Sequence, residues 1–157
     1  MKPKIFLEST IPSLLVARTS RDVAIAGQQQ TTRDWWENRR RHYKLHVSEL
    51  VLDEISQGEP AMAAARQTVL KECAILPALD EARELGEAIV KAGLIPAKAA
   101  ADAFHIATAA VHHMDFLLTW NCRHIANAAI SNRLRSLCEK AGYEVPVLCT
   151  PYELMLE

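Results

Sequence analysis

Short runs of apolar residues recur along the chain, and none of them alternates with polar residues. The clearest is Ile5-Phe6-Leu7, which ends abruptly in Glu8-Ser9-Thr10. A continuous apolar run of this length is typical of a strand buried on both faces of a parallel sheet. The same pattern predicts further strands at residues 43–47, 115–119 and 146–150, and a short strand or connector at 74–79.

Between these runs, apolar residues follow helical spacing, and start and stop signals divide them into helices. Pro12 suits the first turn of a helix to about Arg18, and Ser48 suits the N-cap of a helix that stops near Gly58. Further helices are predicted from Ser20 to about Arg40, from Pro60 to about residue 73, from an N-cap at Asp80 to Gly93, and at residues 97–113, 123–130, 132–142 and 151–157.

Strands that alternate with helices predict an α/β fold: a three-layer α/β/α sandwich around a mostly parallel sheet. No linker, repeat or low-complexity stretch interrupts the pattern, so residues 1–157 are predicted to form a single domain.

Composition narrows the class of protein. The formal net charge is −1, which does not fit a protein that depends on a general basic surplus to bind nucleic acid, so any such contact must be local. The four cysteines are widely spaced and predicted to be reduced in a cytoplasmic protein. No apolar run approaches the ~20 residues of a membrane span. The five glycines form no phosphate-binding loop.

Acidic and hydroxyl side chains follow the predicted strands. Glu8 ends the first strand, and Glu54 lies on the helix after the second. Asp102 lies among alanines in the helix before the strand that ends in Thr119-Trp120-Asn121. Ligands of open α/β sheets bind at these carboxyl ends. An unpaired carboxylate among apolar residues is costly, and a divalent cation would compensate it. The alternatives are a helix cap, a solvated acid, or a surface pair of Asp102 with Lys98.

The order of four segments resembles the PIN-domain family, in particular VapC-like toxins. These segments are "FLEST", "ELVLDEISQG", "ADAFHIATA" and "FLLTWNCRHI", and their order extends the resemblance from Ile5 to about Ile125. The resemblance implies a five-stranded parallel sheet and a ribonuclease dependent on Mg²⁺ or Mn²⁺, the toxin of a type II toxin–antitoxin pair. It also implies an RNA substrate and a cognate antitoxin that inhibits the enzyme.

Carried over residue by residue, the resemblance places the catalytic residues at Glu8, Glu54, Asp102 and Asn121, the first three as metal ligands. Glu8 stands where aspartate is commoner, and Asn121 replaces a fourth acid, with His124 as the alternative position. Supporting partners of these groups are predicted at Ser9, Thr10, His105, Thr119 and His124, and cations for RNA at Arg18, Arg21, Lys98 and Arg123.

Two other functions fit the same residues. The departures at Glu8 and Asn121 would suit a catalytically weak PIN-like module that binds RNA or protein. Trp35 and Trp36, on adjacent helical faces, would suit a structural subunit that dimerises, and a homodimer is compatible with all three functions. The basic segment "RRRHYKLH" (residues 39–46) is either a solvated helix end or a surface that faces RNA.

Overall fold

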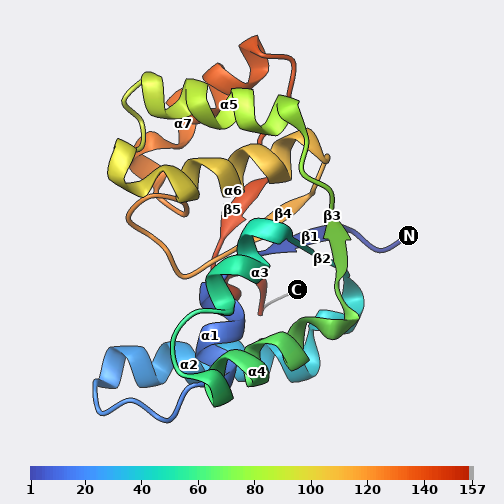
Figure 1. The fold of residues 1–157 in the computed structure, drawn as a ribbon, viewed down its shortest axis with the longest axis vertical. Coiled ribbons are helices and arrows are strands. Elements are labelled where there is room, and N and C mark those ends of the chain that lie inside the picture. The colour runs from blue at the N-terminus through green and yellow to red at the C-terminus, as the bar shows by residue number, and fades with distance from the viewer. Residues whose placement is uncertain (156–157) are drawn as a thin grey trace.

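The computed structural model describes residues 1–155. Five parallel strands form one sheet in the order β3-β2-β1-β4-β5 (Figure 1). Their bounds are Lys4–Leu7 (β1), Lys44–Ser48 (β2), Ala74–Leu76 (β3), Phe116–Leu118 (β4) and Val147–Cys149 (β5). The central strand β1 is paired in parallel with β2 on one side and β4 on the other. The carboxyl ends of these three strands therefore lie side by side.

The helices cover the sheet in two layers. Helices α1 to α4 lie on one side in Figure 1, and α5, α6 and α7 pack together on the other. The α-helices span Thr10–Val16 (α1), Val23–Asn38 (α2), Glu49–Ile55 (α3), Pro60–Val69 (α4), Asp80–Lys91 (α5), Ala100–Val111 (α6) and Ala128–Lys140 (α7). Short 3₁₀ turns occur at Arg40–His42 (η1), Leu70–Glu72 (η2), Ala97–Ala99 (η3) and Pro151–Leu154 (η4). The predicted α/β/α sandwich with a parallel sheet is confirmed.

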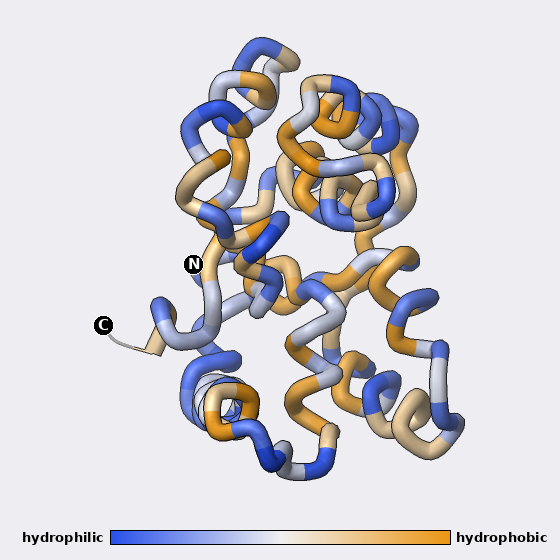
Figure 2. The backbone as a smooth tube through the Cα atoms, turned by 90° about the vertical axis from the view of Figure 1, so that its left-hand side faces the viewer, coloured by the Kyte–Doolittle hydropathy of each residue, from blue (hydrophilic) through white to orange (hydrophobic). Residues whose placement is uncertain are grey.

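The hydrophobic core explains why the strands lack alternation. Ile5, Phe6 and Leu7 of β1 are fully buried, as are Leu117 and Leu118 of β4, because helices cover both faces of the central strands. Most helices are amphipathic, and Figure 2 shows hydrophobic and hydrophilic segments alternating along them. No helix within residues 1–155 is long and apolar enough to cross a membrane.

Helix caps were predicted with mixed success. Ser48 caps α3 as expected, since its Oγ accepts the Val51 N–H at 3.2 Å. Asp22, not Ser20, caps α2 by accepting the Ile25 N–H, while Ser20 Oγ accepts the N–H of Asp22. Asp80 does not cap α5: it is the first helical residue, after Leu79 at the N-cap position.

The predicted helix at residues 123–130 is wrong. The chain from residue 121 to 127 is a loop, held by Ile125 and Ala126 N–H bonds to the Asn121 carbonyl. Helix α7 begins only after Asn127, whose side chain accepts the Ala129 N–H. The two helices predicted on either side of residue 131 are thus one helix, and the loop before it lies next to the carboxyl end of β4. In the last predicted helix, residues 156–157 lie outside the described residues.

Two glycines in helix interiors offer a test of the α5–α6 packing. The ring of Phe104 on α6 occupies the space of a Cβ atom on Gly86, whereas nothing lies within 4 Å of that position on Gly27. We expect Gly86→Ala to lower the free energy of unfolding by about 1–3 kcal/mol because of overpacking. Gly27→Ala should raise it by about 0.5–1 kcal/mol through reduced backbone entropy. Urea denaturation of both variants measures the free energy of unfolding. An equal change in both variants would contradict the close α5–α6 contact.

Candidate metal centre

Glu8 lies at the carboxyl end of the central strand and is 5% exposed. One of its oxygens, Oε1, is held by hydroxyl groups from two different segments. Thr10 Oγ1 and Thr119 Oγ1 each lie 2.6 Å from it, and the Thr10 N–H donates to it at 3.2 Å. The strand end, the start of α1 and the end of β4 therefore converge on a single carboxylate oxygen.

The directions of these hydrogen bonds follow from the neighbouring backbone groups. Thr10 Oγ1 accepts the N–H of Trp120 at 2.9 Å, and Thr119 Oγ1 accepts the N–H of Asn121 at 2.9 Å. An N–H can only donate, so each hydroxyl is left with its own proton to give to Glu8. Both threonines thus orient the carboxylate as an acceptor. No hydrogen bond or ion pair reaches Glu8 Oε2 in the described part of the chain.

Glu54, on α3, is oriented in a similar way. Its Oε1 accepts a hydrogen bond from Ser9 Oγ and lies 2.8 Å from His105 Nε2, while Oε2 has no partner among residues 1–155. Burial raises the pKa of Glu54, but the hydrogen bonds from His105 and Ser9 and the favourable charge interaction with His105 outweigh it, so its pKa is below 4.5. Glu54 is therefore a carboxylate at neutral pH.

His105 projects from α6 and is 1% exposed. Its Nδ1 is buried and has no hydrogen-bond partner. Because the Glu54 carboxylate can only accept, His105 Nε2 carries a proton and donates it to Glu54. Among the predicted acids, His105 thus contacts Glu54 and not Asp102, which lies on its own helix.

Glu8, Glu54 and His105 form the group that is suited to a metal ion. One ligand atom from each lies within 4.8 Å of the others. Each carboxylate has one oxygen fixed by protein donors and the other without a partner, which is the arrangement a hard divalent cation requires. Glu8 is also a buried carboxylate without a cationic partner among the described residues, and a cation would compensate it. The residues present therefore fit a divalent metal.

Asp102 lies in the first turn of α6, three residues before His105, and its side chain is half-buried. It is not a member of the group formed by Glu8, Glu54 and His105. The alternative surface pair with Lys98 does not form, and no hydrogen bond or ion pair holds the Asp102 carboxylate within residues 1–155. Asp102 is thus a free acid on the same helix as His105.

Asn121 shapes the loop after β4. Its Oδ1 accepts the His124 N–H at 3.0 Å, so the amide oxygen of this predicted catalytic residue stabilises a turn in this structure. His124 contributes this backbone N–H to the turn, and its side chain is half-buried. Directly before Asn121, Trp120 donates its indole N–H to Thr32 of α2 at 2.7 Å, which fixes the loop against the helical layer.

The cations predicted to contact RNA are solvent-exposed. Arg18 and Arg21 lie between α1 and α2, Lys98 in η3 and Arg123 in the loop after β4. No ion pair engages any of them within residues 1–155. They come from chain segments next to α1, α6 and β4; α6 carries His105, and Thr10 of α1 and Thr119 after β4 hold Glu8.

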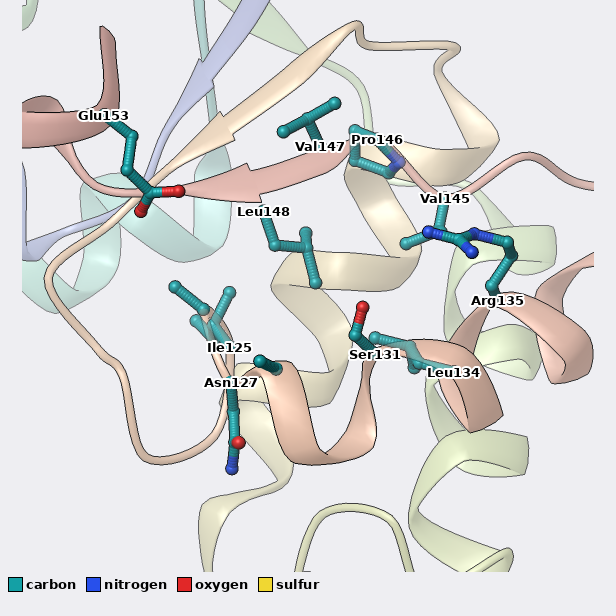
Figure 3. Close-up of a pocket in the computed structure, with 12 residues that line it drawn as sticks. Ile125, Asn127, Ser131, Leu134, Arg135, Val145, Pro146, Val147, Leu148 and Glu153 are labelled. Carbon is teal, nitrogen blue, oxygen red and sulfur yellow. The ribbon is translucent and has the colours of Figure 1, made fainter. Parts of the chain in front are cut away.

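The cavity of about 360 Å³ between α7 and β5 is separate from the acids. Figure 3 shows Leu134, Val145 and Leu148 facing it, with Ser131 and Arg135 beside them. None of the predicted site residues lines this cavity. The candidate metal centre is instead the group of Glu8 after β1, Glu54 on α3 and His105 on α6.

The fold is similar to that of one chain in a solved complex. A chain in the crystal structure of VapBC2 from Rickettsia felis, bound to a DNA fragment from their promoter, matches with a TM-score of 0.58. The match covers 93% of this chain and 97% of that one, at 15% sequence identity. No protein-family model matches the sequence, and no curated protein sequence matches it. The likeness shows that the fold is PIN-like.

Proposed function

We propose that this protein is a metal-dependent endoribonuclease that hydrolyses RNA phosphodiester bonds, and that it is the toxin of a type II toxin–antitoxin module. The observation that carries the proposal is the buried Glu8 carboxylate, which has one oxygen fixed by two threonines and the other without a partner among the described residues, and which forms a group with Glu54 and His105. The PIN-like fold supports it, because this cluster lies at the carboxyl ends of the strands.

The residues of the cluster would hold Mg²⁺ or Mn²⁺. Glu8 and Glu54 would bind it through their free oxygens, and Asp102, one helical turn before His105, would complete the set directly or through water. When bound, such an ion supplies charge stabilisation to a scissile phosphate and lowers the pKa of a coordinated water.

The remaining residues position these groups. Thr10 and Thr119 hold Glu8, while Ser9 and His105 hold Glu54, so neither carboxylate has to be ordered when substrate arrives. Asp102 is free to orient an attacking water. Asn121 and His124 would shape the loop beside the RNA. The RNA phosphates would be met by the exposed cations Arg18, Arg21, Lys98 and Arg123.

An antitoxin protein is part of the proposal. The similar solved structure is a VapBC complex, and a cognate antitoxin that covers the acidic cluster would restrain cleavage in the cytoplasm. A homodimer is also proposed.

A catalytically weak PIN-like module that binds RNA or protein is the second candidate. It is favoured by Asn121, whose amide oxygen is used within the loop and which offers no fourth carboxylate.

Cleavage of a mixed RNA pool tests the proposal. The purified chain is compared with Asp102→Asn, each with Mg²⁺, with Mn²⁺ and with EDTA, after mass spectrometry has shown that no antitoxin co-purifies. We expect metal-dependent cleavage by the parent and its loss in the variant, because the amide carries no charge and cannot orient a nucleophile as a base. If both proteins are inert and neither binds Mn²⁺, the binding module is the better description.

A further inference from the structure

A second concave site lies at the opposite end of the sheet. A cavity of about 530 Å³ is lined by Lys44, Leu45 and His46 of β2, Ala74 of β3, and Lys2, Arg40, Arg41, Tyr43 and Glu72. Lys44 and Ala74 are the first residues of their strands, and Lys2 precedes β1. Since all strands are parallel, this cavity lies at their amino ends, and the acidic cluster lies at their carboxyl ends.

The cavity is strongly basic although the chain as a whole has a net charge of −1. Four Lys and Arg side chains line it against one acid, Glu72, and Arg40 pairs with that acid at 2.8 Å. Lys2, Arg41 and Lys44 are exposed and have no ion-pair partner in the described part of the chain. Three positive charges are therefore left without compensation around one concavity.

Stabilisation of a helix end accounts for the cations that follow α2 but not for the two lysines. Arg40 donates to the Trp36 carbonyl at 2.7 Å near the end of α2, and its guanidinium lies 4.9 Å from the centre of the Trp36 ring. Lys2 and Lys44 come from the starts of two strands, so the partial negative charge of the helix end does not explain their position.

The lining also indicates which part of a nucleic acid would bind. The ring of Tyr43 is packed against Trp35, with centroids 5.6 Å apart, and against Phe116 at 5.8 Å. Its ring is thus engaged by the protein core rather than left as a stacking platform for bases. What the cavity offers are ammonium and guanidinium groups, which recognise phosphate irrespective of base.

We propose that this basic cavity, defined by Lys2, Arg41 and Lys44, binds the phosphodiester backbone of RNA at a distance from the acidic cluster. The choice of RNA rests on the proposed function. Strand β1 has four residues, so the two ends of the sheet are separated by roughly 13 Å along the strand. One RNA strand that follows the surface would contact both sites, and the basic cavity would add affinity without adding sequence preference.

Binding of a fluorescent mixed-sequence RNA in EDTA tests this proposal without cleavage. The test variant is Lys2→Gln/Arg41→Gln/Lys44→Gln, and the control is Lys91→Gln/Arg133→Gln/Lys140→Gln, which removes three exposed cations elsewhere. We expect the test variant to bind at least about five-fold more weakly at low salt. The negative slope of log affinity against log salt should become shallower by about 2, at ~0.7 per single-strand phosphate contact. The control variant should bind like the parent.

Three outcomes would overturn the proposal. The first is unchanged RNA binding by the test variant, and the second is RNA binding that is weakened equally in the test and control variants. The third is a preference of the parent for duplex DNA over RNA of the same sequence that the test variant loses. Selective weakening in the test variant supports it even if the parent cleaves no RNA, so the nuclease proposal can fail separately. If the parent does cleave, the test variant should raise KM for a long RNA with little change in kcat, because it leaves the acidic cluster intact. Thermal unfolding at the parent temperature confirms that the exposed substitutions preserve the fold.

Discussion

Glu8→Gln is expected to reduce metal-dependent RNA cleavage at least about 100-fold, equivalent to about 2.7 kcal/mol of transition-state stabilisation. Glutamine is the informative replacement because its carbonyl oxygen can still accept the hydroxyls of Thr10 and Thr119. Only the free oxygen is exchanged, for an amide NH₂ that cannot bind a cation. The substitution therefore removes a metal ligand while it leaves the supporting hydrogen bonds in place.

The measurement combines cleavage rates with Mn²⁺ binding by calorimetry. Glu84→Gln is the control, since Glu84 is exposed on α5 and undergoes the same chemical change. We expect Glu8→Gln to lose Mn²⁺ affinity together with activity, whereas Glu84→Gln should resemble the parent. Cleavage by Glu8→Gln at the parent rate would contradict the assignment of Glu8 as a ligand and with it the candidate metal centre.

The position of Glu8 could be predicted because it depends on strand order alone. A buried strand that ends abruptly in Glu8-Ser9-Thr10 places these side chains at the carboxyl edge of a parallel sheet whatever the packing around them. The same reasoning located Thr119 at the end of β4, and the structure joins it to Glu8 at 2.6 Å. For these two residues, the end of the apolar run in the sequence and the parallel arrangement of the strands give the same position.

Which group of α6 reaches the cluster could not be predicted. Asp102 and His105 are three residues apart, hence on one face and ~4.5 Å apart along the helix axis. Seven of the twelve residues of α6 are buried, so its hydrophobic pattern does not show which turn lies beside Glu54. The axial placement of α6 against the sheet decides this, and it brings His105 to 2.8 Å from Glu54.

Competing local signals account for the other errors. Ser20 and Asp22 are both good N-cap residues two positions apart, and Ser20 instead donates its N–H to the Gln29 side chain, an interaction between distant residues. In the segment 123–130, the residues suit a helix, but Asn121 accepts the His124 N–H and holds the loop beside β4. In each case a side-chain hydrogen bond that the sequence pattern does not specify decided between two local alternatives.

His105→Leu is expected to lower RNA cleavage about 10- to 100-fold, the usual effect of removing a partner that orients a metal ligand. Leucine fills the buried space but donates no hydrogen bond, which leaves Glu54 with Ser9 as its only described partner. His105→Gln is the matched variant, because its amide can still donate to Glu54. We expect it to retain more of the activity and of the Mn²⁺ affinity than His105→Leu.

The pH dependence separates positioning from simple loss of packing. In the parent, the pKa of Glu54 is held below its usual value of 4.5 by His105 and Ser9 against the effect of burial. The resulting stabilisation is present above pH 4.5 and is lost as the pH falls through the lower folded-state pKa. In His105→Leu, burial still raises the pKa of Glu54 and only Ser9 remains to lower it, so this pKa should rise. The acidic limb of the pH–rate profile should then move to higher pH.

Urea denaturation and cleavage assays across this pH range check both effects. Glu54→Gln, which has no charge to lose, should show a weaker loss of stability on acidification than the parent. An acidic limb that does not move in His105→Leu would contradict the positioning role. Equal inactivity of the leucine and glutamine variants, both folded, would indicate that the imidazole itself contacts the metal, as its place within 4.8 Å of Glu8 and Glu54 permits.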